Sequence, residues 1–201
     1  MMPRVSEEYL EKRKQLIVNS AALVFSKKGF TEATMKDVMT EAGISRGGLY
    51  AHFENIDALF LEVLKMDDEK DKQSLLKIGE NPSVLKGIEL WVRELFEEMN
   101  LPDRDLIRAR SEYFLKYTEK EVPYLAERRN GLEQMLLTVL TKGVEEKELA
   151  DTIELPIFVS VFISSIDGLM LNLNEYRRLS TNDEKQKKVT MLIEMLQQYL
   201  V

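Results

Sequence analysis

Apolar residues recur at intervals of three and four along most of this chain, a period that predicts α-helices rather than strands. The first such stripe runs through residues 7–28, where Ile17, Ala21 and Val24 fall on one face and lysines and glutamates surround them. Two lysines and Gly29 follow at its end, and cations before a glycine are typical of a helix C-terminus. The pattern therefore predicts a helix over residues 7–28.

The same period returns in six further segments, which prolines and polar runs separate. Pro82, Pro123 and Pro156 each stand at the start of an apolar stripe, where proline is tolerated because its missing N–H needs no partner there. No segment shows the alternation of a half-buried strand. Helices are expected over residues 55–78, 82–99, 103–118, 123–147, 156–178 and 180–200. With two short helices between residues 34 and 54, the chain is expected to be all-α with about nine helices.

Residues 34–54 carry the signals of two short helices joined by a tight turn. Thr34, with Asp37 three residues later, is close to a capping box at a helix start. Gly43 supplies the left-handed residue that ends this helix, and Ser45 caps the next one. Two helices joined by a three- to four-residue turn containing glycine form a helix-turn-helix, whose second helix enters the DNA major groove.

The charge distribution agrees with this assignment once the chain is divided. The net charge of −7 disfavours DNA binding for the chain taken as a whole. Residues 1–50, however, hold eight Lys and Arg against six Asp and Glu, a net charge of +2. The remaining 151 residues hold 20 basic against 29 acidic residues, a net charge of −9. Because phosphate binding follows the local field, we expect the basic N-terminal segment to bind DNA.

Composition excludes several kinds of chemical site. With 44% hydrophobic and 31% charged residues, the 201 residues are ordinary globular protein of one or two domains. The absence of Cys excludes disulfides, thiolate metal sites and Cys nucleophiles. The single His, His52, has no neighbouring metal ligands or nucleophile, so no metal site and no enzyme active site are expected. The first residues lack the apolar run of a signal peptide, and we expect a cytoplasmic protein.

Residues 155–173 are the one stretch that approaches a membrane span in length and apolarity. Asp167 lies inside it, and an acid near the bilayer centre costs about 2.5–3.5 kcal/mol on insertion scales. We therefore expect a soluble helix with no membrane partner, buried by its own subunit on one side and by a second copy on the other. The residues expected in this dimer interface are Phe158, Phe162, Ile166, Leu169, Leu192 and Leu196.

From Ile17 to Phe60 the chain resembles the DNA-binding domain of tetracycline-repressor-like (TetR family) transcriptional regulators. The remainder follows the family only in being helical with an apolar closing pair of helices. The matching residues are Ile17, Ala21-Ala22, Phe25, Lys28-Gly29-Phe30, Thr34, Ala42-Gly43-Ile44-Ser45, Gly47, Leu49-Tyr50, His52-Phe53 and Leu59-Phe60.

The resemblance implies a homodimeric, ligand-responsive repressor that binds a palindromic double-stranded DNA operator and is released by a small effector. It divides the chain into a DNA-binding domain, residues 1–54, and a ligand-binding and dimerisation domain, residues 55–201. Ile56 departs from the family, in which many members have Lys, so one phosphate contact is expected to be missing. Carried over by position, the DNA contacts are Thr34, Lys36, Ser45, Arg46, Gly47, Gly48, Tyr50, His52 and Asn55.

The sequence leaves three alternatives open. Arg46 can contact either a guanine edge or a phosphate. The effector is expected to be lipophilic, and the acidic surplus of the C-terminal part favours a cation; no cofactor is expected. Alternatively, a protein partner rather than a small molecule controls the regulator, which then acts as a repressor or an activator. Residues that either contact the effector or simply form the core are Trp91, Phe96, Glu112, Tyr113, Tyr117, Asp167 and Met170.

Overall fold

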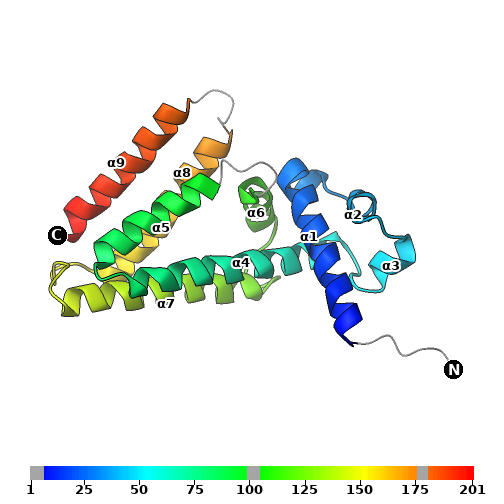
Figure 1. Ribbon diagram of the computed structural model, residues 1–201, viewed down its shortest axis with the longest axis horizontal. Coiled ribbons are helices and arrows are strands. Elements are labelled where there is room, and N and C mark those ends of the chain that lie inside the picture. Colours follow the sequence, from blue (N-terminus) through cyan, green and yellow to red (C-terminus); the bar gives the residue numbers. More distant parts are fainter. Residues whose placement is uncertain (1–6, 99–104, 176–180) are drawn as a thin grey trace. The chain divides into compact units, whose positions relative to one another are not determined.

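The computed structural model describes residues 7–98, 105–175 and 181–201, and all regular elements in these ranges are α-helices (Figure 1). The all-α fold is therefore confirmed. The nine helices of the described ranges are α1 (Glu7–Glu32), α2 (Met35–Ala42), α3 (Arg46–Tyr50), α4 (Ile56–Glu80), α5 (Val84–Glu98), α6 (Ile107–Lys116), α7 (Tyr124–Glu145), α8 (Leu155–Glu175) and α9 (Asn182–Leu200).

The chain folds into two compact units. Unit 1 comprises residues 1–68 and 103–116, and unit 2 comprises residues 69–102 and 117–201. Unit 1 therefore contains α1 to α3, the first half of α4 and, from much later in the sequence, α6. The functional boundary expected after residue 54, between a DNA-binding and a ligand-binding domain, stays a prediction. The compact units have different boundaries, because α6 packs with unit 1.

The core of unit 1 is a cluster of four aromatic rings from α1, α4 and α6. The ring centroids of Phe25 and Phe60 lie 4.7 Å apart, and the Tyr113 ring lies 4.9 Å from Phe30 and 4.8 Å from Phe60. All four side chains are buried. Aromatic pairs at these distances add about 0.5–1.5 kcal/mol each to the stabilisation that burial itself provides. The cluster explains why α6 packs on unit 1.

Helix ends follow side-chain caps more closely than they follow the apolar stripes. Asp105 Oδ1 accepts the Ile107 N–H at 2.9 Å where α6 begins. Thr181 and Glu184 form a complete capping box at the start of α9. The expected interruption at residues 100–103 and the end of the helix expected to reach residue 178 lie outside the described residues.

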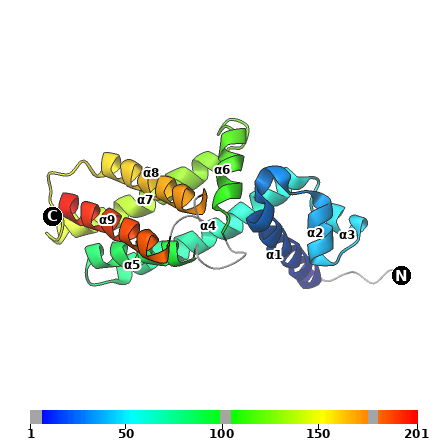
Figure 2. The same ribbon diagram turned by 90° about the horizontal axis from the view of Figure 1, so that it is seen from above.

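In unit 2, α8 and α9 lie antiparallel. The ring of Phe158 near the start of α8 stacks on Tyr199 near the end of α9, with 5.6 Å between centroids. At the opposite ends, Lys188 Nζ of α9 donates to Asn172 Oδ1 of α8 at 3.3 Å. Figure 2 shows the two helices running beside each other, with α5 and α7 nearby. Apolar residues of all four helices are buried and form the core of this unit.

The start of α5 is fixed by a carboxylate from far along the chain. Glu148 accepts hydrogen bonds from Ser83 Oγ at 2.5 Å, the Val84 N–H at 2.7 Å and the Leu85 N–H at 3.0 Å. Burial raises the pKa of Glu148, but these three donors outweigh it and hold the pKa below its usual value. The helix therefore begins after Ser83 and not at Pro82, where the sequence had predicted its first turn.

Replacing Glu148 by Gln is expected to lower the free energy of unfolding by about 1–2 kcal/mol at pH 7, because hydrogen bonds to a charged acceptor become neutral ones. The folded-state pKa lies below the unfolded value of about 4.3, so this stabilisation is present above pH 5 and is lost as pH falls through the folded pKa. Urea unfolding at pH 7 and at pH 3 measures both effects. Glu145→Gln, an exposed neighbour, is the control; an equal loss there would contradict the capping role.

α8 is the one helix in the described ranges that is long and apolar enough to cross a membrane, over residues 155–174. The core helix of a soluble protein passes the same test by length and composition. Phe158, Phe162 and Ile166 of α8 are buried in unit 2. Packing within the protein therefore accounts for the apolar residues on this face.

Candidate functional site

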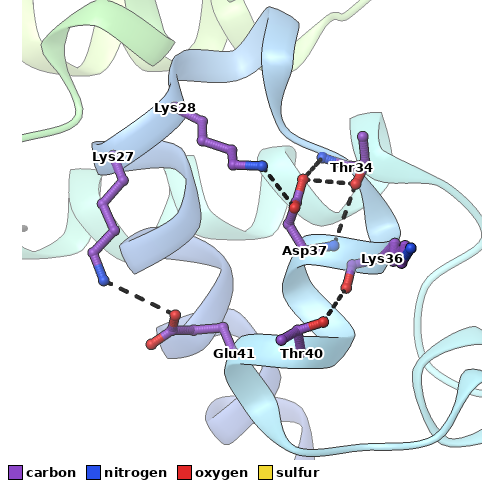
Figure 3. Close-up of polar contacts among 7 residues, drawn as sticks. All are labelled: Lys27, Lys28, Thr34, Lys36, Asp37, Thr40 and Glu41. Carbon is purple, nitrogen blue, oxygen red and sulfur yellow. Dashed lines mark hydrogen bonds and ion pairs between the residues drawn. The ribbon is translucent and has the colours of Figure 1, made fainter.

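α2 and α3 have the helix-turn-helix geometry that the sequence predicted. Thr34 Oγ1 accepts the Asp37 N–H at 3.2 Å, and Asp37 Oδ2 accepts the Thr34 N–H at 3.0 Å, so the capping box is complete (Figure 3). Gly43 ends α2 in the left-handed region, with φ 62° and ψ 35°. Ser45 Oγ then accepts the Gly48 N–H at 3.2 Å and caps α3. Each of the four predicted signals has the predicted local role.

Asp37 also ties α2 to the end of α1. Lys28 Nζ donates to Asp37 Oδ1 at 2.6 Å, and the Thr34 hydroxyl donates to Oδ2 at 2.6 Å (Figure 3). The hydrogen bond from Lys28, followed by those from Thr34, lowers the pKa of Asp37. The Thr34 hydroxyl is thus already engaged inside the protein. Its contact with a phosphate stays a prediction, and the backbone N–H groups at the start of α2 are the more available donors.

Several cations of the basic segment are neutralised within unit 1. They pair as Lys12 with Glu8, Lys14 with Glu62, Lys27 with Glu41 and Lys28 with Asp37, at distances from 2.5 to 3.9 Å. In the described ranges, the side chains of Arg13, Lys36 and Arg46 have no carboxylate partner. These three are therefore the cations most available for phosphates.

α3 is amphipathic although it spans only five residues. Leu49 is completely buried, whereas Arg46, Gly47 and Tyr50 are exposed. The Arg46 guanidinium lies over the Tyr50 ring, 5.3 Å from its centroid, in a cation–π contact. Leu49 anchors the helix, and the opposite face presents a cation and an aromatic hydroxyl to solvent.

Arg13 of α1 is a neighbour of α3 that sequence reasoning missed. A Cβ on Gly48 would lie 3.1 Å from Arg13 Nη2, so the guanidinium packs beside the start of α3. Apart from its chain neighbours and the backbone of α3, no heavy atom lies within 4 Å of the position where Gly47 would carry a Cβ. Glycine at 48 thus makes room for Arg13, and glycine at 47 leaves the surface open. The sequence offered no signal for Arg13, because 35 residues separate it from Gly48.

The remaining predicted DNA contacts lie around the turn into α4. Asn55 Oδ1 accepts the Ala58 N–H at 2.8 Å and thereby caps the start of α4. His52 is half-buried beside Phe53, and its main-chain N–H donates to Leu49. Lys36 is exposed on α2, and its carbonyl accepts the Thr40 hydroxyl at 3.0 Å. Contact of these residues with DNA stays a prediction.

Two of the predicted effector contacts, Glu112 and Tyr113, lie in unit 1 instead. Tyr113 belongs to its aromatic core. Glu112 Oε2 accepts the Thr31 N–H at 2.7 Å, and Oε1 accepts Arg108 Nε at 2.7 Å. Burial raises the pKa of Glu112, but these hydrogen bonds outweigh it and lower the pKa overall. Both side chains thus have structural roles that explain their presence without an effector.

The carboxylate of Glu112 lies directly against a break in the regular helix geometry of α1. Gly29 has φ 76° and ψ −179°, and a Cβ there would lie 2.8 Å from both Glu112 oxygens. Any larger residue at position 29 would be strained by this backbone conformation and would also displace the carboxylate. Gly29 therefore allows the end of α1 and α6 to approach each other closely.

The other effector candidates lie in unit 2 in different environments. Trp91, Phe96 and Met170 are buried, Tyr117 is half-buried and Asp167 is exposed. The Trp91 ring packs edge-to-face against Phe162 of α8, which links α5 to α8. No group of three or more His, Cys, Asp or Glu side chains in the described ranges is arranged to hold a metal ion.

The six predicted dimer residues differ in their burial within the single chain, and their place in an interface stays a prediction. Phe158, Phe162 and Ile166 are buried, and Leu169, Leu192 and Leu196 are half-buried. The three buried side chains pack inside unit 2, whereas the three half-buried ones keep surface that a second copy can contact. The exposed apolar residues of the same two helices are instead Ile157, Val161, Leu171, Met191, Met195 and Tyr199, between 42% and 63% exposed.

Comparison with known proteins gives consistent matches. A family model described as bacterial regulatory proteins, tetR family, matches residues 17–63, and one described as tetracyclin repressor-like, C-terminal domain, matches residues 87–189. The uncharacterised HTH-type transcriptional regulator YfiR of Bacillus subtilis is 29% identical over 202 residues, covering 100% of this chain and 96% of the relative. The HTH-type transcriptional repressor Rv1474c of Mycobacterium tuberculosis is 36% identical over 69 residues, covering 34% of this chain and 37% of the relative.

A solved structure shares the fold across nearly the whole chain. FadR of Bacillus subtilis, in complex with stearoyl-CoA, superposes with a TM-score of 0.77 at 14% sequence identity. The superposition covers 93% of this chain and 99% of that chain.

Proposed function

Because the chain belongs to the TetR family of bacterial transcriptional regulators, we propose that it is a homodimeric repressor that a small effector releases from its operator. In this proposal each subunit inserts α3 into one of two successive major grooves of a palindromic DNA site. The cations around α3 that have no carboxylate partner, Arg13, Lys36 and Arg46, are the single observation that carries the proposal.

The arrangement of unit 1 supports DNA contact at α3. Arg46 and Tyr50 project from its exposed face, Lys36 stands on α2, and Arg13 lies beside Gly48. In our proposal Arg46 contacts a guanine edge or a phosphate, while Arg13 and Lys36 neutralise phosphates. Gly47 leaves room for the DNA backbone to approach α3.

The exposed apolar face of α8 and α9 supports a dimer. Soluble monomers rarely expose contiguous apolar patches, so a face of this kind marks an interaction site. A twofold interface places the same face of both subunits in contact and would supply two copies of α3. We assign the interface to Ile157, Val161, Leu171, Met191, Met195 and Tyr199.

The apolar core of unit 2 supports a lipophilic effector. The structure of FadR contains stearoyl-CoA and shows that this fold can bind a lipophilic ligand. At 14% sequence identity, the similarity supports a common fold but does not identify the ligand of this chain. α4 contributes residues to both units, so it can transmit a change between them. A coupling free energy of about 1–3 kcal/mol would lower operator affinity 5–150-fold.

Selection of bound fragments from genomic and random DNA with the purified protein tests this function. We expect one palindromic sequence, bound by a dimer, to be enriched. The proposed regulator function would be contradicted if the recovered fragments had no common sequence and bound no more tightly than bulk DNA.

The salt dependence of operator binding provides a quantitative prediction. Arg13 and Lys36 give four phosphate contacts per dimer, so log Kd should change with log salt concentration with a slope of about 4 in magnitude, or about 5 if Arg46 also contacts phosphate. Lys36→Gln should reduce this slope by about 2, because it removes two phosphate contacts per dimer. Lys187→Gln in α9, where Asp183 pairs with the lysine, is the control and should leave the slope unchanged. Equal slopes for wild type and Lys36→Gln would exclude Lys36 from the interface.

A further inference from the structure

The interior of unit 2 contains a hydrogen-bond donor without an acceptor. Trp91 of α5 is the only tryptophan of the chain, and 6% of its surface is exposed. In the described ranges, its indole Nε1 is the one buried side-chain nitrogen or oxygen without a hydrogen-bond partner. Buried polar groups are nearly always paired, because losing water without a replacement costs free energy. An acceptor from outside these residues, such as an atom of a bound molecule, would satisfy this N–H.

The surroundings of Trp91 are apolar. Its ring packs against Phe162 with 6.1 Å between centroids, and Phe158 lies 5.7 Å from Phe162. Within the described ranges the buried polar or charged residues are Ser20 and Asp68, and both belong to unit 1. The buried residues of unit 2 therefore offer an apolar molecule one polar side-chain group, the Trp91 N–H.

Charge on such a molecule would have no buried partner. Asp167, the acid on α8 among the candidate effector contacts, is exposed. Glu112 lies in unit 1, where Thr31 and Arg108 already donate to it. Transferring an ion into an apolar interior without a counter-charge is strongly unfavourable. The environment consequently disfavours the cationic effector that the acidic composition had favoured.

We propose that Trp91 Nε1–H is the hydrogen-bond donor of the effector site, and that the effector is an uncharged, mainly apolar molecule with an acceptor oxygen. Ketone, ester and amide carbonyls have this chemistry. The apolar body packs on the α5 and α8 side chains, and the oxygen accepts from the indole. The inference rests on the proposed function, since it identifies the class of molecule that the regulator detects.

Wild-type protein permits a direct test, because its tryptophan fluorescence, excited selectively, comes from Trp91 alone. Three probes with the same ten-carbon chain and different head groups are titrated: 2-decanone, decanoate and decylammonium. We expect 2-decanone to bind saturably and to shift the emission to longer wavelength, as hydrogen bonding at the indole nitrogen does. The two ions should bind at least about tenfold more weakly, because no buried counter-charge is present.

The Trp91→Phe substitution removes the indole N–H donor but keeps an aromatic ring at this position. Calorimetry should show 2-decanone binding about three- to tenfold more weakly to this variant, the loss expected for one hydrogen bond. Ile88→Val, which alters a buried apolar residue of the same helix without removing a polar atom, is the control. It should keep the preference for 2-decanone over decylammonium. Far-UV circular dichroism verifies that both variants fold, and the wild-type fluorescence result stands even if one does not.

Either of two results would overturn the proposal. One is a wild-type emission that 2-decanone leaves unchanged or that decylammonium shifts at lower concentration. The other is a folded Trp91→Phe protein that binds 2-decanone as tightly as wild type. Operator binding, measured on wild-type protein without any probe, is independent of both. Intact operator binding with no response to 2-decanone therefore refutes this inference alone, whereas absent operator binding refutes the regulator function.

Discussion

Val161→Glu in α8 is expected to convert the proposed dimer to a monomer. Val161 is 60% exposed in the single chain and lies on the apolar face that we assign to the interface. Twofold symmetry would bring two copies of the new carboxylate into one apolar contact, where unpaired charges cost several kcal/mol. Because every 1.4 kcal/mol is tenfold in affinity, the dimer dissociation constant should rise at least about 100-fold.

Light scattering coupled to size-exclusion chromatography measures this change directly. The variant should have a mass of 23.4 kDa, and the wild type twice that value. Leu76→Glu is a matched control, because Leu76 is 55% exposed on α4, outside the assigned face. Operator binding should be lost with the dimer, since a monomer occupies only one half-site. A Val161→Glu protein that remains dimeric at micromolar concentration would place the interface elsewhere.

Arg46→Ala should weaken operator binding about thirtyfold or more without affecting dimerisation. A bidentate contact to a base contributes about 1–3 kcal/mol, and the dimer would lose two such contacts. Alanine favours helix, and the Arg46 side chain is exposed, so α3 should stay folded. Fluorescence anisotropy with the selected operator measures the affinity, and the mass of the variant verifies that it remains a dimer.

Arg129→Ala is the control for Arg46→Ala. Arg129 is an exposed arginine of unit 2 that pairs with Glu119 at 2.9 Å, so its loss removes a cation without touching unit 1. If Arg46 contacts bases, the variant should also discriminate less between the operator and a copy with one changed guanine. If it contacts phosphate, binding should weaken equally for all sequences. An Arg46→Ala affinity within twofold of wild type would falsify the assignment of α3 as the reading helix.

Local chemistry made the helix-turn-helix predictable. The roles of Thr34, Gly43, Ser45 and Asn55 depend on backbone groups within three or four residues, so the sequence alone identifies both the residue and its partner. The ends of α5 and α6 were less predictable. For α5 the reason is that its cap, Glu148, comes from 65 positions beyond Ser83, and no local pattern indicates such a contact.

The interface and effector residues show a second limit. Periodicity identifies which face of a helix is buried only when the opposite face is polar. α8 is apolar nearly all round, so Phe158 and Ile157 were indistinguishable until the structure buried one and exposed the other. Glu112 and Tyr113 were similarly indistinguishable from effector ligands, because their packing on α1 joins segments about 80 residues apart.

The internal ion pairs of unit 1 have a consequence for how such a protein searches a genome. A regulator meets on the order of a million or more non-operator sites, and its attraction to them grows with every cation free to neutralise phosphate. By holding Lys14 and Lys28, Glu62 and Asp37 limit this indiscriminate attraction while leaving the reading surface of α3 unchanged. We therefore expect the acids of the DNA-binding unit to contribute to selectivity, because they should shorten the time that the protein spends on non-operator DNA.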